Sequence, residues 1–306
     1  MHEGSAHVRS NNTGLTLVEL MVAMAISLVA FGLIYQAYAA QQRARTREQL
    51  VVDMQQNARA ALAFMRRELR MAGFDPRYVD GIDNDHDDGP DDPDESANTG
   101  FSKARHHWVR FTLDLNGDGD DNDANEDIEY RFEDADDTNG DGIANAGAAA
   151  LKRKSENGGS FSNLAYDIVA VAFAYAFDND GDGALDTYPS PPAPEGVVIW
   201  AYDSDPPGDD DLDSHLDTNM DGVIDASDAA GGGQLSDVPG APNNIHLDKI
   251  RAVRVWLLAR TRYPIRGYVD NETYVVGRHH LTPANAYKHC LLEGMVFCRN
   301  MGASSP

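Results

Sequence analysis

The sequence predicts an α+β fold, in which one long N-terminal helix packs on an antiparallel sheet that carries long acidic loops. An apolar stretch near the N-terminus runs without a break into a segment whose apolar residues recur every three or four positions. Short apolar runs typical of strands follow, and Asp-rich segments separate them. A helix followed by successive strands favours an α+β arrangement over alternating βα units.

The composition limits the classes of partner. The 306-residue chain has 50 acidic and 25 basic residues, which give a formal net charge of −25. Because nucleic-acid binding depends on Lys and Arg neutralising phosphates, this surplus argues against a nucleic-acid partner. The acidic residues cluster in loops after residue 80, a distribution that indicates cation binding rather than general solubility.

The N-terminal region reads as a polar leader followed by a membrane-spanning helix. The first 14 residues are polar, the chain turns apolar at Leu15, and no charge occurs between Leu20 and Ala40. A helix over that uncharged stretch would be roughly 31 Å long, which matches a bilayer core. No A-x-A cleavage site follows the apolar run, so this segment should stay on the mature protein.

The helix is expected to continue to residue 72, because an apolar stripe runs along its second half. Gly73 and Pro76 then end it. This half should be the support on which the sheet packs. The stripe consists of Val51, Met54, Ala58, Ala61, Leu62, Met65, Leu69 and Ala72.

Seven later runs have strand character, with polar loops between them. They cover residues 106–113, 127–133, 167–177, 196–202, 249–262, 272–276 and 291–299. In the third run, large and small side chains alternate, so they lie on opposite faces of a strand. The sequence does not decide which face meets the helix. The large residues are Val169, Val171, Phe173, Tyr175 and Phe177, and the small ones are Ala170, Ala172, Ala174 and Ala176.

One acidic loop has the full pattern of a calcium site. Ca²⁺ takes six to eight oxygen ligands, and a loop supplies them when Asp or Asn alternate before a glycine at the bend. The segment 217–228 has this pattern, with Asp in place of the usual final Glu, and it resembles dockerin-type calcium loops. Its candidate ligands are Asp217, Asn219, Asp221, Asp225 and Asp228, with Gly222 at the bend.

Four shorter segments repeat part of this pattern. A single match of this kind can equally be a solvated acidic loop, but recurrence between predicted strands favours calcium binding in at least some of them. We therefore expect calcium as a structural cofactor. The candidate ligands are Asp178, Asp180, Asp182 and Asp186; Asp114, Asn116 and Asp118; Asp137, Asn139 and Asp141; and, with no glycine at the bend, Asp83, Asp85 and Asp87.

The cysteine and histidine residues give weaker evidence of metal, haem or disulfide sites. Cys290 and Cys298 lack zinc spacing, and no C-x-x-C-H for haem occurs. A disulfide between them is expected only if this region lies outside the cytoplasm, and two free thiols are the open alternative. The pairs His106-His107 and His279-His280 are expected to be bystanders, because adjacent residues on a strand point to opposite faces.

No motif for catalysis or nucleotide binding occurs. The sequence lacks a nucleophile elbow, a phosphate loop and a dinucleotide fingerprint. A glycosidase needs two carboxylates in a rigid cleft, whereas the Asp pairs here lie in Gly-rich loops. We therefore expect neither an enzyme nor a haem or nucleotide cofactor.

Residues 14–19, Gly-Leu-Thr-Leu-Val-Glu, resemble the prepilin peptidase site of type IV pilins and type II secretion pseudopilins. The resemblance implies that the peptidase cleaves after Gly14 and that Leu15, in place of the commoner Phe, becomes the methylated N-terminus. It also implies that the Glu19 carboxylate pairs with the N-terminal ammonium of a neighbouring subunit. The alternative for Glu19 is an interfacial carboxylate that reaches the headgroups.

Two further segments narrow the resemblance. Residues 56–74 resemble the helix exit of minor pilins of the PilW type and, less closely, of J-type pseudopilins. Residues 249–261 and the closing Arg299-Asn300 resemble the C-terminal strands of that group. The resemblance implies a cleaved leader over 1–14, a pilin helix over 15–73 with its membrane span near 20–40, and an extracytoplasmic β-rich head over 74–306.

The resemblance also implies a location, partners and a function. The protein would cross the inner membrane once, with its head in the periplasm, and then join a pilus at the cell surface. Its partners would be the prepilin peptidase, other minor and major pilins and the inner-membrane assembly platform. The expected function is that of a structural minor pilin in a pilus tip or initiation complex. The alternatives are a J-type pseudopilin of type II secretion and a calcium-dependent pilus-tip adhesin.

One feature opposes this orientation. Arg43, Arg45 and Arg47 follow the apolar span, whereas Arg9 alone precedes it, and the positive-inside rule would then place the head in the cytoplasm. The rule describes a statistical bias, whereas a prepilin motif implies a dedicated export pathway. The motif is therefore given the greater weight.

Overall fold

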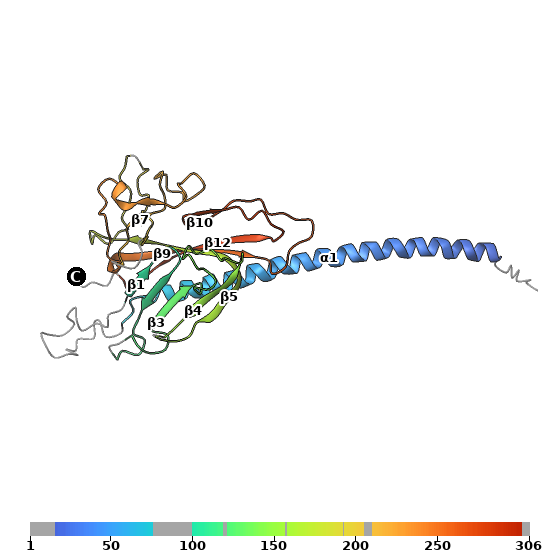
Figure 1. The fold of residues 1–306 in the computed structure, drawn as a ribbon, viewed down its shortest axis with the longest axis horizontal. Coiled ribbons are helices and arrows are strands. Elements are labelled where there is room, and N and C mark those ends of the chain that lie inside the picture. The colour runs from blue at the N-terminus through green and yellow to red at the C-terminus, as the bar shows by residue number, and fades with distance from the viewer. Residues whose placement is uncertain are drawn as a thin grey trace, which may run out of the picture. The chain divides into compact units, whose positions relative to one another are not determined.

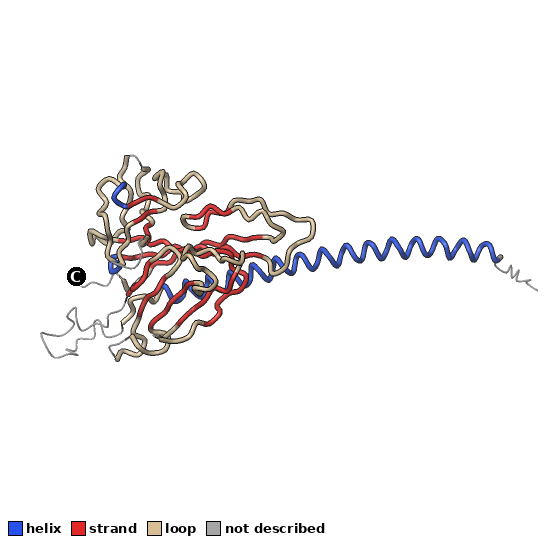
Figure 2. Tube along the Cα trace, in the orientation of Figure 1, coloured by secondary structure: helices blue, strands red, loops and turns tan. Residues whose placement is uncertain are grey.

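A computed structural model describes residues 16–75, 100–118, 121–156, 158–191, 193–204 and 210–301. The chain divides into two compact units, Met1–Gln49 and Leu50–Pro306. One continuous helix, α1 (Leu17–Leu69), runs through the boundary between them, so the predicted single long helix is confirmed with slightly shorter bounds. Strands and loops follow it along the chain (Figures 1 and 2).

The second half of α1 packs on the sheet through the predicted stripe. The stripe residues Met54, Ala58, Ala61, Leu62, Met65, Leu69 and Ala72 are all buried, and Val51 is half-buried. A partly buried ion pair adds specificity, because Arg153 of the sheet donates two hydrogen bonds of 2.7 and 2.9 Å to Glu68 on the helix. The Tyr130 hydroxyl also donates to Glu68. The apolar stripe and this polar contact fix the helix in register on the sheet.

The regular helix ends at Leu69, three residues earlier than predicted, and a turn over residues 70–73 leads to the predicted stop at Gly73. Gly73 has a φ of +74°, a left-handed conformation that costs glycine little and other residues more. Its N–H donates to the carbonyl of Thr112 at 3.1 Å, which ties the end of the helix to the sheet. Pro76 lies outside the described residues.

All neighbouring strands of the main ten-stranded sheet pair in the antiparallel sense, as predicted (Figure 1). The sheet branches at β5, which pairs with β4, β6 and β9. Its strands are β1 (Gly100–Ala104), β2 (Val109–Thr112), β3 (Asp127–Arg131), β4 (Ala149–Lys154), β5 (Ser162–Phe177), β6 (Ala201–Tyr202), β7 (Ser214–His215), β8 (Gly233–Gln234), β9 (Ile250–Arg260) and β12 (His289–Phe297). A separate two-stranded sheet contains β10 (Tyr274–Val276) and β11 (His279–Leu281), and two short 3₁₀ helices cover Leu235–Asp237 and Leu247–Lys249.

The structure decides which face of β5 meets the helix. Phe173 pairs with Val255 of β9, which in turn pairs with Gly294 of β12, so these three residues share one face. A Cβ added at Gly294 would lie 3.3 Å from Leu62 of the helix. The large face of β5 is therefore on the helix side. The small face is also buried, because Ala172 lies against Gly277 in the turn between β10 and β11.

The predicted strand runs have the right positions in the chain, but their bounds agree only partly with those of the observed strands. Each of the seven contains an observed strand, but 196–202 contributes only β6, and residues 106–107 belong to a turn. The predictions missed β1, β4, β7, β8 and β11. β4 was not predicted because its Lys and Arg residues interrupt the alternation of apolar and polar side chains that is typical of a strand. These residues bind carboxylates on the sheet and the helix.

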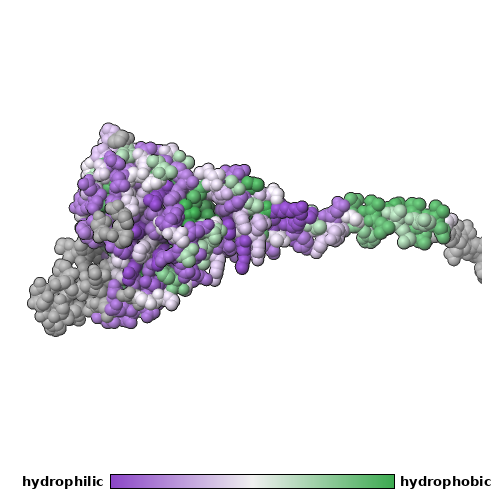
Figure 3. Space-filling model, viewed as in Figure 1, coloured by the Kyte–Doolittle hydropathy of each residue, from purple (hydrophilic) through white to green (hydrophobic). Residues whose placement is uncertain are grey.

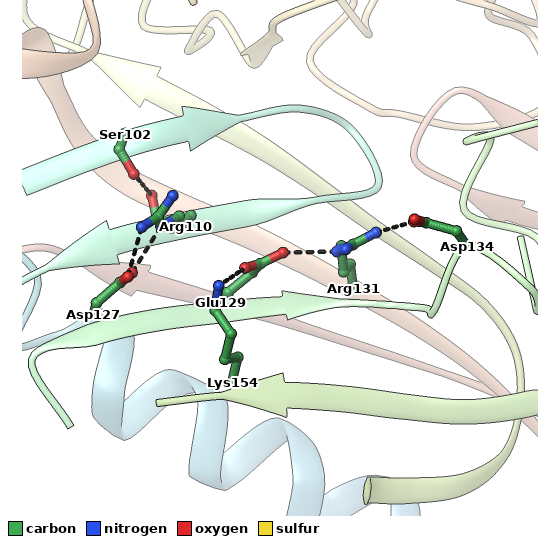
Figure 4. Close-up of polar contacts among 7 residues, drawn as sticks. All are labelled: Ser102, Arg110, Asp127, Glu129, Arg131, Asp134 and Lys154. Carbon is green, nitrogen blue, oxygen red and sulfur yellow. Dashed lines mark hydrogen bonds and ion pairs between the residues drawn. The ribbon is translucent and has the colours of Figure 1, made fainter. Parts of the chain in front are cut away.

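A ladder of charged side chains joins β2, β3 and β4 (Figure 4). Arg110 forms a bidentate ion pair with the buried Asp127, through two hydrogen bonds of 2.6 and 2.8 Å. The next carboxylate along β3, Glu129, contacts Arg131 at 2.7 Å and Lys154 at 2.9 Å. Two-pronged Arg–carboxylate pairs fix geometry as well as charge. The ladder thus stabilises the sheet next to two of the acidic loops, 114–126 and 137–145.

Candidate functional site

The loop 217–228 is built around two buried carboxylates. Asp217, two residues after β7 ends, accepts backbone hydrogen bonds from Asp221 at 3.1 Å and Gly222 at 2.7 Å. Asp228 closes the loop by accepting from the N–H groups of Thr218 at 2.7 Å and Asp225 at 2.9 Å. Gly222 has a φ of +91°, the bend that the pattern assigns to a glycine. All five predicted ligand residues therefore belong to one compact loop.

A second loop brings three carboxylates to one point. Carboxylate oxygens of Asp178, Asp180 and Asp182 lie within 4.8 Å of one another. Asp178 accepts from the N–H groups of Gly181 at 2.8 Å and Gly183 at 3.1 Å. The fourth predicted ligand, Asp186, closes the loop by accepting from the N–H of Asn179 at 3.1 Å. Three clustered carboxylates repel one another unless a cation or protons neutralise them.

The loop that begins at Asp137 repeats this arrangement. The Asp137 carboxylate accepts from the N–H groups of Asp141 at 3.1 Å and Gly142 at 2.8 Å. Asn139 donates to Asp141 at 2.8 Å, so the three predicted ligands are adjacent. Asn145 was not among the predicted ligands, and its side chain donates to the Thr138 hydroxyl at 3.2 Å. Asn145 occupies the position that Asp225 has in the longest loop, and that spacing was the available signal.

The loop that begins at Asp114 contains an acidic residue that the sequence analysis overlooked. Asp114 accepts from the N–H of Gly117 at 2.5 Å, and Asn116 donates to Asp118 at 3.0 Å. The buried Glu126 accepts from the N–H groups of Leu115 at 2.8 Å and Asp123 at 3.1 Å. Glu126 thus closes this loop as Asp228 closes the longest one. The three residues of the fifth predicted loop, Asp83, Asp85 and Asp87, lie outside the described residues.

The electrostatics of these loops favour a bound cation. Burial raises the pKa of Asp137, Asp186 and Asp217, and the neighbouring carboxylates raise each pKa further. A charged carboxylate in these surroundings is therefore less stable than in water. Oxygen-rich loops of this kind suit a hard cation, above all Ca²⁺, which takes carboxylate and carbonyl ligands in flexible geometry.

The N-terminal end of α1 forms a second site, at Glu19. Its carboxylate accepts from the backbone N–H of Thr16 at 2.8 Å and from the Thr16 hydroxyl at 2.9 Å. The Thr16 hydroxyl in turn accepts from the N–H of Glu19 at 3.2 Å. This reciprocal pair is a capping box, which the sequence Thr-x-x-Glu signals and which the sequence analysis did not use. Gly14 and Leu15 lie outside the described residues.

The helix that follows Glu19 exposes its apolar side chains. Large apolar residues from Leu17 to Tyr38 are more than half exposed, and apolar surface gathers on this segment (Figure 3). By length and composition the helix can cross a membrane. A continuous apolar surface of this kind needs lipid or other apolar helices around it.

Residues 9–35 match the prokaryotic N-terminal methylation motif. The chain therefore carries the N-terminal signature of a type IV pilin-like prepilin. Comparison with curated proteins and with solved structures gives no match. Together with the apolar helix, the prepilin motif fits a membrane-anchored protein that the prepilin peptidase processes and that assembles with other pilins, in a pilus or a secretion apparatus. Proteins with this motif are structural rather than enzymatic.

The head of this prepilin-like chain has no disulfide between its cysteines. Cys290 and Cys298 are both free; Cys290 lies near the start of β12, and Cys298 directly follows its last residue. The two cysteines are eight positions apart along an extended strand, or about 26 Å at ~3.3 Å per residue, whereas a disulfide needs Cα atoms within about 7 Å. Of the two alternatives that the sequence left open, this fold has the free thiols and not the disulfide.

The strand geometry assumed for the two histidine pairs is right for His279 and His280, which lie on β11, and wrong for the other pair. His106 and His107 lie in the tight turn between β1 and β2, closed by a 2.9 Å hydrogen bond from Arg105 to Trp108, and not on a strand. Their ring centres are 4.6 Å apart, and the ring of His279 lies 5.8 Å from that of His106. The fold thus gathers three histidines from two distant segments. A sequence cannot show this, because it depends on the contact between the β1–β2 turn and the start of β11.

Burial keeps these rings uncharged. It lowers the pKa of His106 far below its usual range, and the adjacent His107 and Arg278 lower it further. Burial also lowers the pKa of His107, to about 4, with the charges of Arg105 and Arg278 adding to the effect. The pKa of His279 falls for the same reason. At neutral pH all three imidazoles are therefore neutral.

Proposed function

We propose that this chain is a structural minor pilin, of the PilW type, that takes part in type IV pilus assembly through the N-terminal half of α1. The observation that carries the proposal is the prepilin motif over residues 9–35, which includes the start of an exposed apolar helix. The head would remain in the periplasm and then at the pilus tip or in its initiation complex. Its partners would be other minor and major pilins and the inner-membrane assembly platform.

Glu19 would exchange one partner for another during assembly. In the isolated chain its carboxylate is held by Thr16 in the capping box. In a filament, the N-terminal ammonium of a neighbouring Leu15 would offer a full opposite charge, which adds a Coulomb attraction that the neutral donors of Thr16 do not supply. The surrounding apolar helices would strengthen this pair, since charges interact more strongly at low dielectric.

Two substitutions separate the capping role from the charge. Glu19→Gln keeps a side chain that can complete a capping box but removes the charge, whereas Glu19→Ala removes both. If the carboxylate pairs with an ammonium in the filament, both variants insert into the membrane and both are depleted from sheared pili. If only capping matters, Glu19→Gln behaves as wild type, and the proposed assembly role of the charge is wrong. Membrane fractionation of each variant provides the control.

The head would be stabilised by calcium in its acidic loops. The four described loops share one design, in which the first Asp accepts backbone hydrogen bonds and the next Asp or Asn side chains lie beside it. Extracellular calcium modules bind with dissociation constants of about 10⁻⁴–10⁻³ M, so millimolar calcium contributes about 0.4–1.4 kcal/mol per occupied loop. For a domain of this size, each loop then raises Tm by about 1–6 °C.

Thermal unfolding of the full chain in detergent tests this part of the proposal. Tm is expected to rise between EGTA and millimolar calcium, and magnesium should reproduce little of the rise. Asp217→Asn, which keeps the shape of the side chain, should reduce the rise, whereas Asp248→Asn, at a side chain 69% exposed, should not. Equal Tm values in EGTA and calcium would show that the loops are solvated acidic linkers.

A further inference from the structure

β12 lies at an edge of the main sheet, and one side of its backbone has no partner strand. In the described part of the chain, β12 pairs with β9 alone. At one end of this pair, the N–H of Cys298 donates to the carbonyl of Arg251 at 2.8 Å. At the other end, the N–H of Thr261 donates to the carbonyl of Lys288 at 2.9 Å. The even-numbered residues of β12 therefore point their backbone groups toward β9, and the odd-numbered ones point theirs away from the sheet.

These outward groups are open along the second half of β12. No hydrogen bond within the described residues reaches the backbone of Glu293, Met295 or Phe297. At the start of the strand, by contrast, the N–H of His289 donates to Asp270 at 3.1 Å. Native edge strands are commonly short or protected by Lys, Pro or a bulge, whereas β12 runs for nine residues without any of these. The edge can therefore accept an additional strand.

One side of this edge is apolar. Gly294 faces α1, because a Cβ there would meet side chains of the helix. Since successive side chains of a strand alternate, Met295 and Phe297 face the other way, where they are 41% and 52% exposed. Glu293 lies on their side of the strand, and Arg254 neutralises it through a contact of 2.6 Å.

The side of the edge that follows the helix is basic. A Cβ at Gly294 would lie 3.0 Å from Cδ of Arg66. Burial raises the pKa of the Cys290 thiol, and the positive charge of Arg59 opposes this rise, so Arg59 also lies near β12. Both arginines are exposed, and within the described residues no carboxylate pairs with either of them. In a chain with a formal net charge of −25, two such arginines beside an open edge indicate an acidic partner.

We propose that β12 binds an extended segment of another protein, in which acidic and apolar residues alternate, as an added strand of the sheet. Backbone groups of the segment would bond with those of Glu293, Met295 and Phe297. Its acidic side chains, on one face, would meet Arg59 and Arg66, and its apolar side chains, on the other face, would meet Met295 and Phe297. This site goes beyond the assembly role proposed above, since it uses no residue of the N-terminal motif.

A second copy of this chain fits the edge less well. If β12 paired with β12 of another copy in the antiparallel sense, the two-fold axis would be perpendicular to the sheet and both helices would lie on the same face. Arg59 and Arg66 of one copy would then face the same two arginines of the other. Like charges placed opposite each other destabilise such a pairing.

Fluorescence anisotropy with the full chain in detergent tests the proposal. The probe is a labelled synthetic peptide in which Glu and Val alternate, and EGTA keeps calcium from bridging this peptide to the acidic loops. The peptide should bind saturably, with an affinity that falls as salt is added. Two control peptides, one with Lys in place of Glu and one with Glu and Val grouped in blocks, should bind about 10-fold more weakly or not at all.

Substitutions on the two sides of the edge separate the backbone contribution from the charge. Met295→Pro removes an outward N–H without breaking the pairing with β9, and it should weaken peptide binding by about 10-fold. Arg59→Glu combined with Arg66→Glu should also weaken it by about 10-fold. Arg67→Glu is the matched control, because Arg67 lies over the ring of Phe64 on the side of the helix that meets β4. It should change the affinity by less than about 2-fold.

Thermal unfolding shows whether each variant is folded, and the exposed arginines are the positions that the fold tolerates best. No saturable binding of the alternating acidic peptide to the wild type would overturn the proposal. Equal binding of the Glu and Lys peptides, or equal affinity in the folded Arg59→Glu/Arg66→Glu and Arg67→Glu proteins, would do the same. A wild-type dimer in sedimentation that Met295→Pro dissociates would assign the edge to a second copy instead.

Discussion

Single residues decide how the acidic loops are built. In each loop the first aspartate is satisfied by backbone N–H groups, and a glycine with positive φ turns the chain so that those groups face the carboxylate. The carboxylate thus orders the loop before any cation arrives. The closing carboxylates, such as Asp228 and Glu126, accept further backbone hydrogen bonds. The clustered negative charges still repel one another, so the loop is organised and electrostatically unfavourable at the same time.

Gly142→Ala should destabilise the head more than Gly181→Ala. Both glycines have positive φ, which costs another residue about 1–2 kcal/mol. A Cβ at Gly142 would also lie 2.5 Å from the carbonyl oxygen of Val171, whereas a Cβ at Gly181 meets no atom within 4 Å. Urea unfolding in EGTA should therefore give a loss of about 3 kcal/mol or more for Gly142→Ala and about 1–2 kcal/mol for Gly181→Ala. Equal losses would mean that the loop moves away from Val171.

His107 should make the head sensitive to acid. Its pKa is about 4 in the folded protein and near 6.5 in the unfolded chain. Between these values the unfolded chain binds more protons, so the free energy of unfolding falls as pH falls from 6.5 towards 4. Each unit of pKa difference corresponds to about 1.4 kcal/mol.

The measurement is urea unfolding at pH 7 and pH 5, in EDTA so that no metal competes with protons. His107→Gln should lose less stability than the wild type over this interval. The raised pKa of Asp137 acts in the opposite direction in both proteins, so the difference between them isolates the histidine. An identical loss in both would show that His107 does not titrate as its burial requires.

At the scale of elements, the periodicity of apolar residues predicted the structures that depend on local sequence. It missed the structures that depend on contacts between distant residues. The helix, its buried stripe and the left-handed turn at Gly73 follow from residues close together in the chain, and the structure confirms them, although the helix ends at Leu69 rather than at residue 72. β4 escaped prediction because its charged residues are satisfied by Glu68, Glu129 and Glu133, which lie elsewhere in the sequence. Glu126 was missed as a loop-closing carboxylate because it lies one position further from Asp114 than Asp228 lies from Asp217.

Met65→Ala should show how strongly the helix is held by the sheet. Met65 is fully buried in the stripe, and removing a buried side chain of this size costs about 2–5 kcal/mol. Val52, 47% exposed on the same helix, provides the control, because Val52→Ala should change stability by less than about 0.5 kcal/mol. Chemical unfolding of both variants measures the difference. A loss below 1 kcal/mol for Met65→Ala would indicate that the site collapses around the missing atoms.

At the scale of the whole molecule, basic and acidic residues lie in different parts of the head and have different roles. The basic residues of β2, β3 and β4 bind carboxylates within the sheet, while most of the acidic surplus lies in loops. The folded head is thus held by its core and its ion pairs, and its loops remain open to cations. In the described part of the N-terminal unit, the large apolar residues from Leu17 to Tyr38 are exposed and need lipid or neighbouring subunits around them.

Processing at the start of α1 should convert the membrane precursor into an assembly-competent subunit. We predict cleavage between Gly14 and Leu15, within the matched motif, because a new ammonium at Leu15 would stand one residue before the capping Thr16. Intact mass of the membrane-extracted protein should show loss of residues 1–14 and gain of one methyl group. In a strain with active prepilin peptidase, a species that still begins at Met1 would contradict the prediction.

Gly14→Ala should be processed better than Gly14→Leu, because the peptidase accepts only a small side chain before the cut. The capping box of Thr16 and Glu19 lies after this position, so α1 should form in both variants and any difference in mass would report on the peptidase alone.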